Sequence, residues 1–99
     1  MNIKIQSVKF DADVKLLNFI ENKINKLEQY YNNIIGAEVI LKLDKSGASD
    51  NKVADIKILI PGNDLFAKRQ SKTFEEAVDS ASEALKKQLV KVKEKQRNK

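Results

Sequence analysis

The side chains able to do chemistry in this 99-residue chain are carboxylates and lysines, because the sequence contains neither histidine nor cysteine. The usual general bases, nucleophiles and soft-metal ligands are therefore missing. An enzyme built from this set would use aspartates such as Asp55, Asp64 or Asp79 with a divalent metal. Asp79 lies beside expected core positions, where its alternative role is to cap a helix or pair with a lysine. We therefore expect no enzyme activity, no cofactor, no metal site and no small-molecule substrate.

The lysines are the second chemically competent set, and they are concentrated at the C-terminal end. Residues 84–99 hold seven basic residues and one acidic residue, whereas residues 1–83 hold twelve basic and thirteen acidic residues. The whole positive excess therefore lies in the last 16 positions. This asymmetry indicates a polyanionic partner, either nucleic acid or an anionic membrane. The alternative is that the lysines only keep an exposed helix soluble.

The apolar content argues against the membrane. A membrane-surface helix needs a broad apolar face, usually with Trp or Phe, and the C-terminal segment has a narrow one that a sheet is expected to cover. No run approaches the roughly 20 apolar residues of a membrane span. The N-terminal residues MNIKIQSVKF also lack the apolar stretch of a signal peptide. We expect a cytoplasmic protein that binds no membrane.

The elements that must position the lysines follow from periodicity. Alternating polar and apolar residues predict four strands, and helical spacing predicts two helices. The first helix is expected to begin after the N-cap Asp13 and the second after a capping box, Thr73 to Glu76. Turn formers predict a mobile loop over 46–51 and a type II turn over 61–64, with positive φ at Gly62. The strands are expected over 2–6, 37–45, 54–60 and 65–70, and the first helix is expected to end at 30–33.

This order, β-α-β-β-β-α, predicts an α+β fold with a four-stranded mixed sheet and two helices packed on one face. The first two strands flank a helix and are expected to be parallel, through a right-handed crossover. Strands two to four are expected to form an antiparallel meander. Ile40, Leu59 and Phe66 then point to the open face of the sheet. We expect one domain over residues 1–95 and a disordered tail over 96–99.

A helical wheel divides the C-terminal basic residues into two rows beside a buried seam of Leu85, Leu89 and Val92. One row should face the first helix, whose C-terminal half carries Lys23 and Lys26, so that a groove lined by both helices is geometrically possible. Because the aromatic residues are few and mostly at core positions, backbone and shape recognition fits better than base stacking. The rows are Lys87, Lys91 and Lys95 on one flank and Lys86, Lys93 and Arg97 on the other.

Four stretches, in this order and spacing, carry a resemblance that covers nearly the whole chain. The chain resembles the short form of the bacterial ribosome hibernation promoting factor, of the ribosome-associated inhibitor (sigma-54 modulation protein) family. The resemblance implies a fold similar to a double-stranded-RNA-binding domain and a protein that is monomeric when free. The four stretches are KLEQYYNNI at 26–34, VILKLDK at 39–45, ADIKILIPG at 54–62 and FEEAVDSASEALKKQLVKVKEK at 74–95.

The resemblance also implies a function. Such proteins bind the small ribosomal subunit in the channel used by mRNA and tRNA, where basic residues on both helices meet ribosomal RNA. Translation then stops, and idle ribosomes are preserved during stress and stationary phase. Whether this chain pairs ribosomes or only inactivates single ones is left open. The residues at positions that match RNA contacts of the family are Lys23, Lys26, Lys87, Lys91, Lys93 and Lys95, with Lys86 adjacent to them.

The chain departs from the family pattern in several ways, one of which is Ala84 at a helix position that is often basic. Family members often carry histidines, which this chain lacks, and small or acidic residues where its fourth strand has Lys68 and Arg69. These two residues could add a basic site. They also belong to the run KRQSK at 68–72, which motivates an alternative function as a general double-stranded-RNA-binding module that is not specific to ribosomes.

Overall fold

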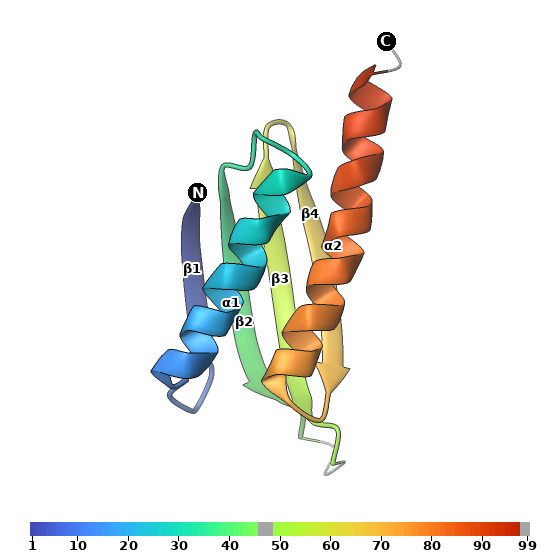
Figure 1. Cartoon of the computed structure of the whole chain (residues 1–99). Helices are drawn as coiled ribbons and strands as arrows, with labels where there is room; N and C mark the ends of the chain where they lie inside the picture. The colour runs from blue at the N-terminus through green and yellow to red at the C-terminus, as the bar shows by residue number, and fades with distance from the viewer. Residues whose placement is uncertain (46–48, 98–99) are drawn as a thin grey trace.

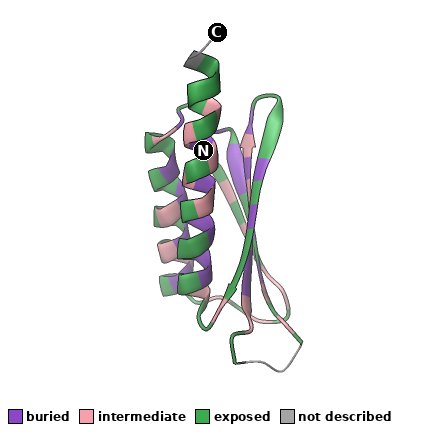
Figure 2. Cartoon of the chain, turned by 90° about the vertical axis from the view of Figure 1, so that its right-hand side faces the viewer, coloured by how far each residue is buried: buried purple, intermediate pink, exposed green. Residues whose placement is uncertain are grey.

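The structure is a computed structural model that describes residues 1–45 and 49–97. Its helices and strands follow one another in the predicted order β-α-β-β-β-α (Figure 1). The sheet order is β1-β2-β3-β4, with β1 parallel to β2 and the other neighbours antiparallel. Both helices cover one face of this mixed sheet, which confirms the predicted fold class (Figure 2). The elements are β1 (Asn2–Ser7), α1 (Val14–Lys26), a short 3-10 helix η1 (Leu27–Gln29), β2 (Gly36–Leu43), β3 (Lys52–Ile60), β4 (Asn63–Ser71) and α2 (Phe74–Arg97).

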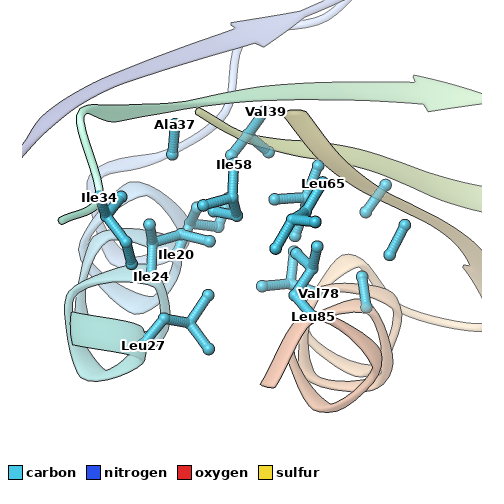
Figure 3. Packing of buried hydrophobic residues seen from close by; sticks show 14 of the residues in the cluster. Ile20, Ile24, Leu27, Ile34, Ala37, Val39, Ile58, Leu65, Val78 and Leu85 are labelled. Atoms are coloured by element: carbon cyan, nitrogen blue, oxygen red, sulfur yellow. The ribbon is translucent and has the colours of Figure 1, made fainter. Parts of the chain in front are cut away.

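The hydrophobic core lies between the sheet and the two helices (Figure 3). Each helix contributes the residues that its periodicity predicted, since residues three and four apart share one face. Ile20 and Ile24 of α1 and Leu85 and Leu89 of α2 have no exposed surface, and Ile58 of β3 is equally inaccessible. The apolar seams of the helices therefore fix which of their polar flanks face each other.

The predicted helix N-termini are confirmed. The carboxylate of Asp13 accepts a hydrogen bond from the backbone N–H of Leu16 at 2.8 Å. The hydroxyl of Thr73 accepts one from the backbone N–H of Glu76 at 3.0 Å. Each cap satisfies an N–H group that has no partner within the helix.

Strands β3 and β4 each begin two residues earlier than the alternation predicted. The hairpin turn contains only Pro61 and Gly62, so that Ile60 pairs with Asn63. Gly62 has a φ of 80°, as the predicted turn requires. The strands begin earlier because the backbones of polar residues at these ends form pairs with the neighbouring strand. The side chains there do not alternate between polar and apolar, so the sequence pattern did not include them. Of the predicted mobile loop, residues 46–48 lie outside the described residues.

The end of α2 differs from the predicted boundary. The helix runs to Arg97, whereas the predicted tail began at residue 96. The side-chain amide of Gln96 donates a hydrogen bond to the hydroxyl of the buried Tyr31 at 3.0 Å, which ties this last turn to the segment after η1. Residues 98 and 99 of the predicted tail lie outside the described residues.

Gly36 lies opposite Asn2 in the parallel ladder of β1 and β2. A Cβ atom at this position would lie 2.8 Å from the carbonyl oxygen of Asn2, which belongs to the paired backbone. We expect Gly36→Ala to lower the free energy of unfolding by about 1–3 kcal/mol, because the added methyl group must push the two strands apart. Urea denaturation measures this change. A Gly36→Ala variant as stable as the unmodified chain would contradict the close approach of the strands.

Candidate nucleic-acid interface

The two helices form a groove between them, and residues of both helices line it, as the helical wheel allowed. Its two hollows have volumes of about 90 and 200 Å³, and the ring of Tyr30 lines both. The row of Lys86 and Lys93 is the one that faces α1, since these residues line the groove together with Lys23 and Lys26. The other lining residues are Leu27, Asp79, Ser82 and Glu83 in the smaller hollow and Gln29, Val90 and Glu94 in the larger one.

The second row of lysines lies on the flank of α2 that faces away from α1. Lys87, Lys91 and Lys95 are exposed. Gln88 marks the direction of this flank, because its side-chain amide donates to the backbone carbonyl of Phe66 on β4 at 3.1 Å. The upper part of α2 also extends beyond the end of α1 and the sheet (Figure 1). Lysines in the last turns of α2 are therefore accessible from several sides.

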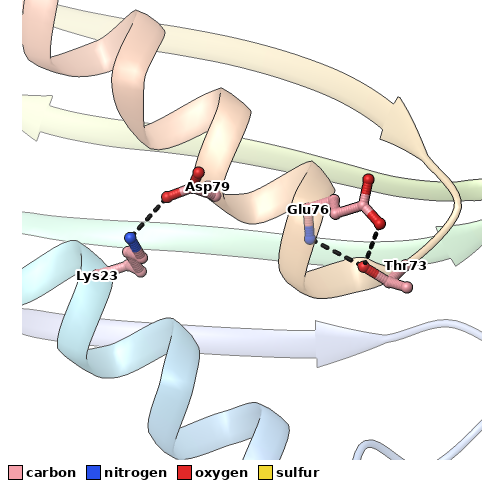
Figure 4. A network of polar contacts seen from close by, with 4 residues as sticks. All are labelled: Lys23, Thr73, Glu76 and Asp79. Atoms are coloured by element: carbon pink, nitrogen blue, oxygen red, sulfur yellow. Dashed lines mark hydrogen bonds and ion pairs between the residues drawn. The ribbon is translucent and has the colours of Figure 1, made fainter.

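Lys23 has a partner within the protein. Its ammonium group lies 2.6 Å from a carboxylate oxygen of Asp79, so that an ion pair joins α1 to α2 (Figure 4). The same ammonium lies 5.6 Å from the centre of the Phe19 ring. Asp79, a candidate for metal-assisted chemistry in the sequence, thus takes its alternative role and pairs with a lysine. The charge of Lys23 is therefore already balanced within the protein.

Lys86 also has a partner. Its ammonium group lies 5.1 Å from the centre of the Tyr30 ring, at a distance typical of a cation–π contact. The sequence pattern places the aromatic residues mostly at core positions, and Tyr30 is not among the predicted site residues. The doublet Tyr30–Tyr31 at the end of the first helical run was the available signal, because neighbouring residues there cannot both point inward. Tyr31 is buried, and Tyr30 lies in the groove.

The remaining candidates are free cations. Lys26, Lys87, Lys91, Lys93 and Lys95 are exposed, and within residues 1–45 and 49–97 none of them has a carboxylate oxygen within 4.0 Å. Lys87, Lys91 and Lys95 follow one another at intervals of four residues, which keeps this row on one face of α2. The structure therefore places five unpaired lysines on two adjacent helices, where they can contact the phosphates of a nucleic acid.

The three aspartates considered for catalysis do not come together. Asp55 lies on the open face of the sheet and pairs with Lys42 at 3.4 Å, whereas Asp79 lies on α2 over the opposite face. Asp64 is exposed at the start of β4. Among the described residues no group of three or more metal-binding side chains occurs. In the same part of the chain, no helix combines the length and apolar character needed to cross a membrane.

Known proteins match this chain from β1 through α2. The family model described as sigma 54 modulation protein / S30EA ribosomal protein matches residues 3–97. The chain belongs to this family. The ribosome hibernation promoting factor of Azotobacter vinelandii is a family relative with 26% identity over 96 residues, which cover 97% of this chain and 86% of that protein. The factor of the same name from Klebsiella oxytoca is 25% identical over 95 residues, 96% of each chain.

Solved structures share the family fold. A ribosomal subunit interface protein from Coxiella burnetii superimposes with a TM-score of 0.83 and 24% identity, covering 94% of this chain and 98% of that one. The N-terminal domain of Thermus thermophilus Protein Y gives a TM-score of 0.80 at 24% identity, covering 93% of this chain and 99% of that domain. The family description and the names of these relatives refer to ribosome-associated proteins and not to enzymes.

Proposed function

We propose that this chain is a ribosome hibernation factor of the cytoplasm, which binds the small ribosomal subunit in the channel used by mRNA and tRNA. Bound there, it inhibits translation and preserves idle ribosomes. Membership of the sigma 54 modulation / S30EA family supports the ribosome as the partner. The observation that carries RNA binding is the set of five exposed lysines without carboxylate partners on α1 and α2. Phosphate contacts by such lysines supply affinity that does not depend on base sequence.

The seven candidate lysines take different parts in this proposal. Lys26, Lys87, Lys91, Lys93 and Lys95 contact phosphates of ribosomal RNA directly. Lys86 lies over the Tyr30 ring and adds positive potential to the groove. Lys23 bridges α1 and α2 through its ion pair with Asp79, and this carboxylate competes with a phosphate for the ammonium group.

The alternative, a general double-stranded-RNA-binding module, would use the run at 68–72 beside the helix lysines. Lys68 lies on the open face of the sheet because it is two residues from Phe66 on the same strand. The helix lysines lie on the opposite side of the sheet (Figure 2). One duplex lying against the helices would leave Lys68 uncontacted, so this lysine does not support the alternative.

Co-sedimentation with purified small ribosomal subunits at moderate salt tests the proposal. We expect the chain to migrate with the small subunit and to inhibit a cell-free translation system at matching concentrations. A 20-base-pair RNA duplex serves as the competitor. Absence of co-migration would contradict the proposal, and tighter binding to the duplex than to the subunit would favour the alternative.

A further inference from the structure

The face of the sheet opposite the helices is uncovered in this structure (Figure 2). Most of its side chains are polar, but it also carries three apolar residues that the strand pattern predicted to point outward. Phe66 is 53% exposed and Ile40 is 37% exposed, while Leu59 is half-buried. Phe66 is therefore the aromatic side chain most available to a partner on this face.

Lysines lie on two sides of Phe66. Lys57 is directly opposite it on β3, and Lys68 follows two residues later on the same face of β4. The cross-strand neighbour of Lys68 is Asp55, whose carboxylate already pairs with Lys42 at 3.4 Å. Within the described ranges, no carboxylate oxygen lies within 4.0 Å of Lys68, and the only one that close to Lys57 is that of Glu38, at the 4.0 Å limit.

The backbone holds Phe66 in place. Its carbonyl oxygen accepts the hydrogen bond from Gln88 of α2 at 3.1 Å and therefore points away from β3. Phe66 and Lys57 then form a pair of the non-hydrogen-bonded type, in which the Cα atoms of an antiparallel ladder lie about 4.5 Å apart and the side chains are close. Phe66 on the edge strand β4 and Lys57 on its neighbour β3 are thus held as a close cross-strand pair, with the ammonium group of Lys57 within 4.0 Å of Glu38 on β2.

We propose that the open face around Phe66, Lys57 and Lys68 binds single-stranded RNA, with one base stacked on the Phe66 ring and the two lysines on the neighbouring phosphates. An exposed ring flanked by cations is the arrangement by which sheet surfaces hold unpaired bases, because every base has a π-face and every nucleotide a phosphate. Lys68, which has no carboxylate oxygen within 4.0 Å among the described residues, favours an anionic partner over a neutral one at this place. This surface is separate from the helix lysines of the proposed function.

A protein occupant is less well matched to the same face. The apolar area is interrupted by the ion pair of Lys42 with Asp55 and by the contact of Lys57 with Glu38. The cores of protein–protein interfaces are depleted of such charged residues. A paired duplex is matched no better, since its bases are stacked within the helix and cannot reach the ring.

Fluorescence anisotropy of a labelled ten-nucleotide oligouridine with the full chain tests the inference. We expect Phe66→Ala to weaken binding by roughly tenfold, as loss of one base–aromatic stack does. Phe66→Leu separates stacking from apolar contact, because leucine keeps the apolar surface without the ring, and it should weaken binding to a similar extent. Lys68→Gln should reduce the salt dependence of the affinity by about one phosphate contact.

The matched control is Val14→Ala, which removes apolar surface from a residue that is 70% exposed in the first turn of α1. It should leave oligonucleotide binding unchanged, and urea denaturation should show that all variants fold. Unchanged binding in Phe66→Ala, or full binding in Phe66→Leu, would overturn the proposal. Self-association that depends on Phe66, without oligonucleotide binding, would identify a second copy as the occupant and would also overturn it.

Discussion

Affinity for the small ribosomal subunit is expected to fall by roughly 10³–10⁵-fold when monovalent salt is raised from 50 to 200 mM, as for proteins with six to ten phosphate contacts. The seven candidate lysines of α1 and α2 supply contacts in this range. Among the described residues six of them have no internal ion pair, and the seventh, Lys23, pairs with Asp79. Each phosphate that a lysine neutralises releases a condensed counterion, and added salt opposes that release. The dissociation constant, measured at several salt concentrations and constant magnesium, gives the slope directly.

A paired lysine and a free lysine on α1 provide an internal check for this experiment. Lys23→Gln removes a charge that Asp79 already balances at 2.6 Å, whereas Lys26→Gln removes a free charge three residues away. Lys26→Gln should lower the slope by about one and Lys23→Gln by less. An affinity that barely changes between 50 and 200 mM would rule out phosphate contacts as the main source of binding.

The double substitution Lys87→Glu with Lys91→Glu is expected to weaken subunit binding by roughly 10–100-fold and to lower the salt slope by about two. Both side chains are exposed on one row of α2 and contact no carboxylate in the described part of the chain. The free energy of unfolding should change by about 0.5 kcal/mol or less per residue, since surface substitutions cost little. Co-sedimentation measures the first effect and urea denaturation the second.

A second double substitution of equal charge controls for the change in net charge. Lys15→Glu with Lys45→Glu alters two exposed lysines outside the groove and outside both rows of α2. It should retain most of the subunit affinity. If the α2 variant folds and binds as tightly as the unmodified chain, its lysines serve only solubility and the proposed interface is wrong.

Local sequence patterns were sufficient for most of the fold. The alternation in ADIKILI and the capping residues Asp13 and Thr73 predicted elements that the structure confirms. Such signals involve residues within a few positions of one another, so they do not depend on the rest of the chain. Strand ends were placed less well, because backbone pairing at Lys52 and Asn63 continues past the residues whose side chains alternate.

The candidate site was predictable as a set of residues but not as an arrangement. The wheel divided the lysines of α2 into two rows, and the packing of α2 beside α1 then turned Lys86 and Lys93 toward the groove. Lys23 and Asp79, 56 positions apart, were assigned to different functions from sequence and prove to be partners. The contact of Tyr30 with Lys86 likewise joins residues far apart in the sequence, and it forms because the segment after α1 packs beside α2.

The amino-acid sequence thus established the order of the elements, the family resemblance and the positive excess of the last residues, because composition and short-range periodicity encode them. Packing in three dimensions settled which lysines are free, which are paired, and that Tyr30 lies in the groove between the helices. These properties depend on distances between residues of different elements. Such distances arise only when the apolar faces of α1, α2 and the sheet are buried together.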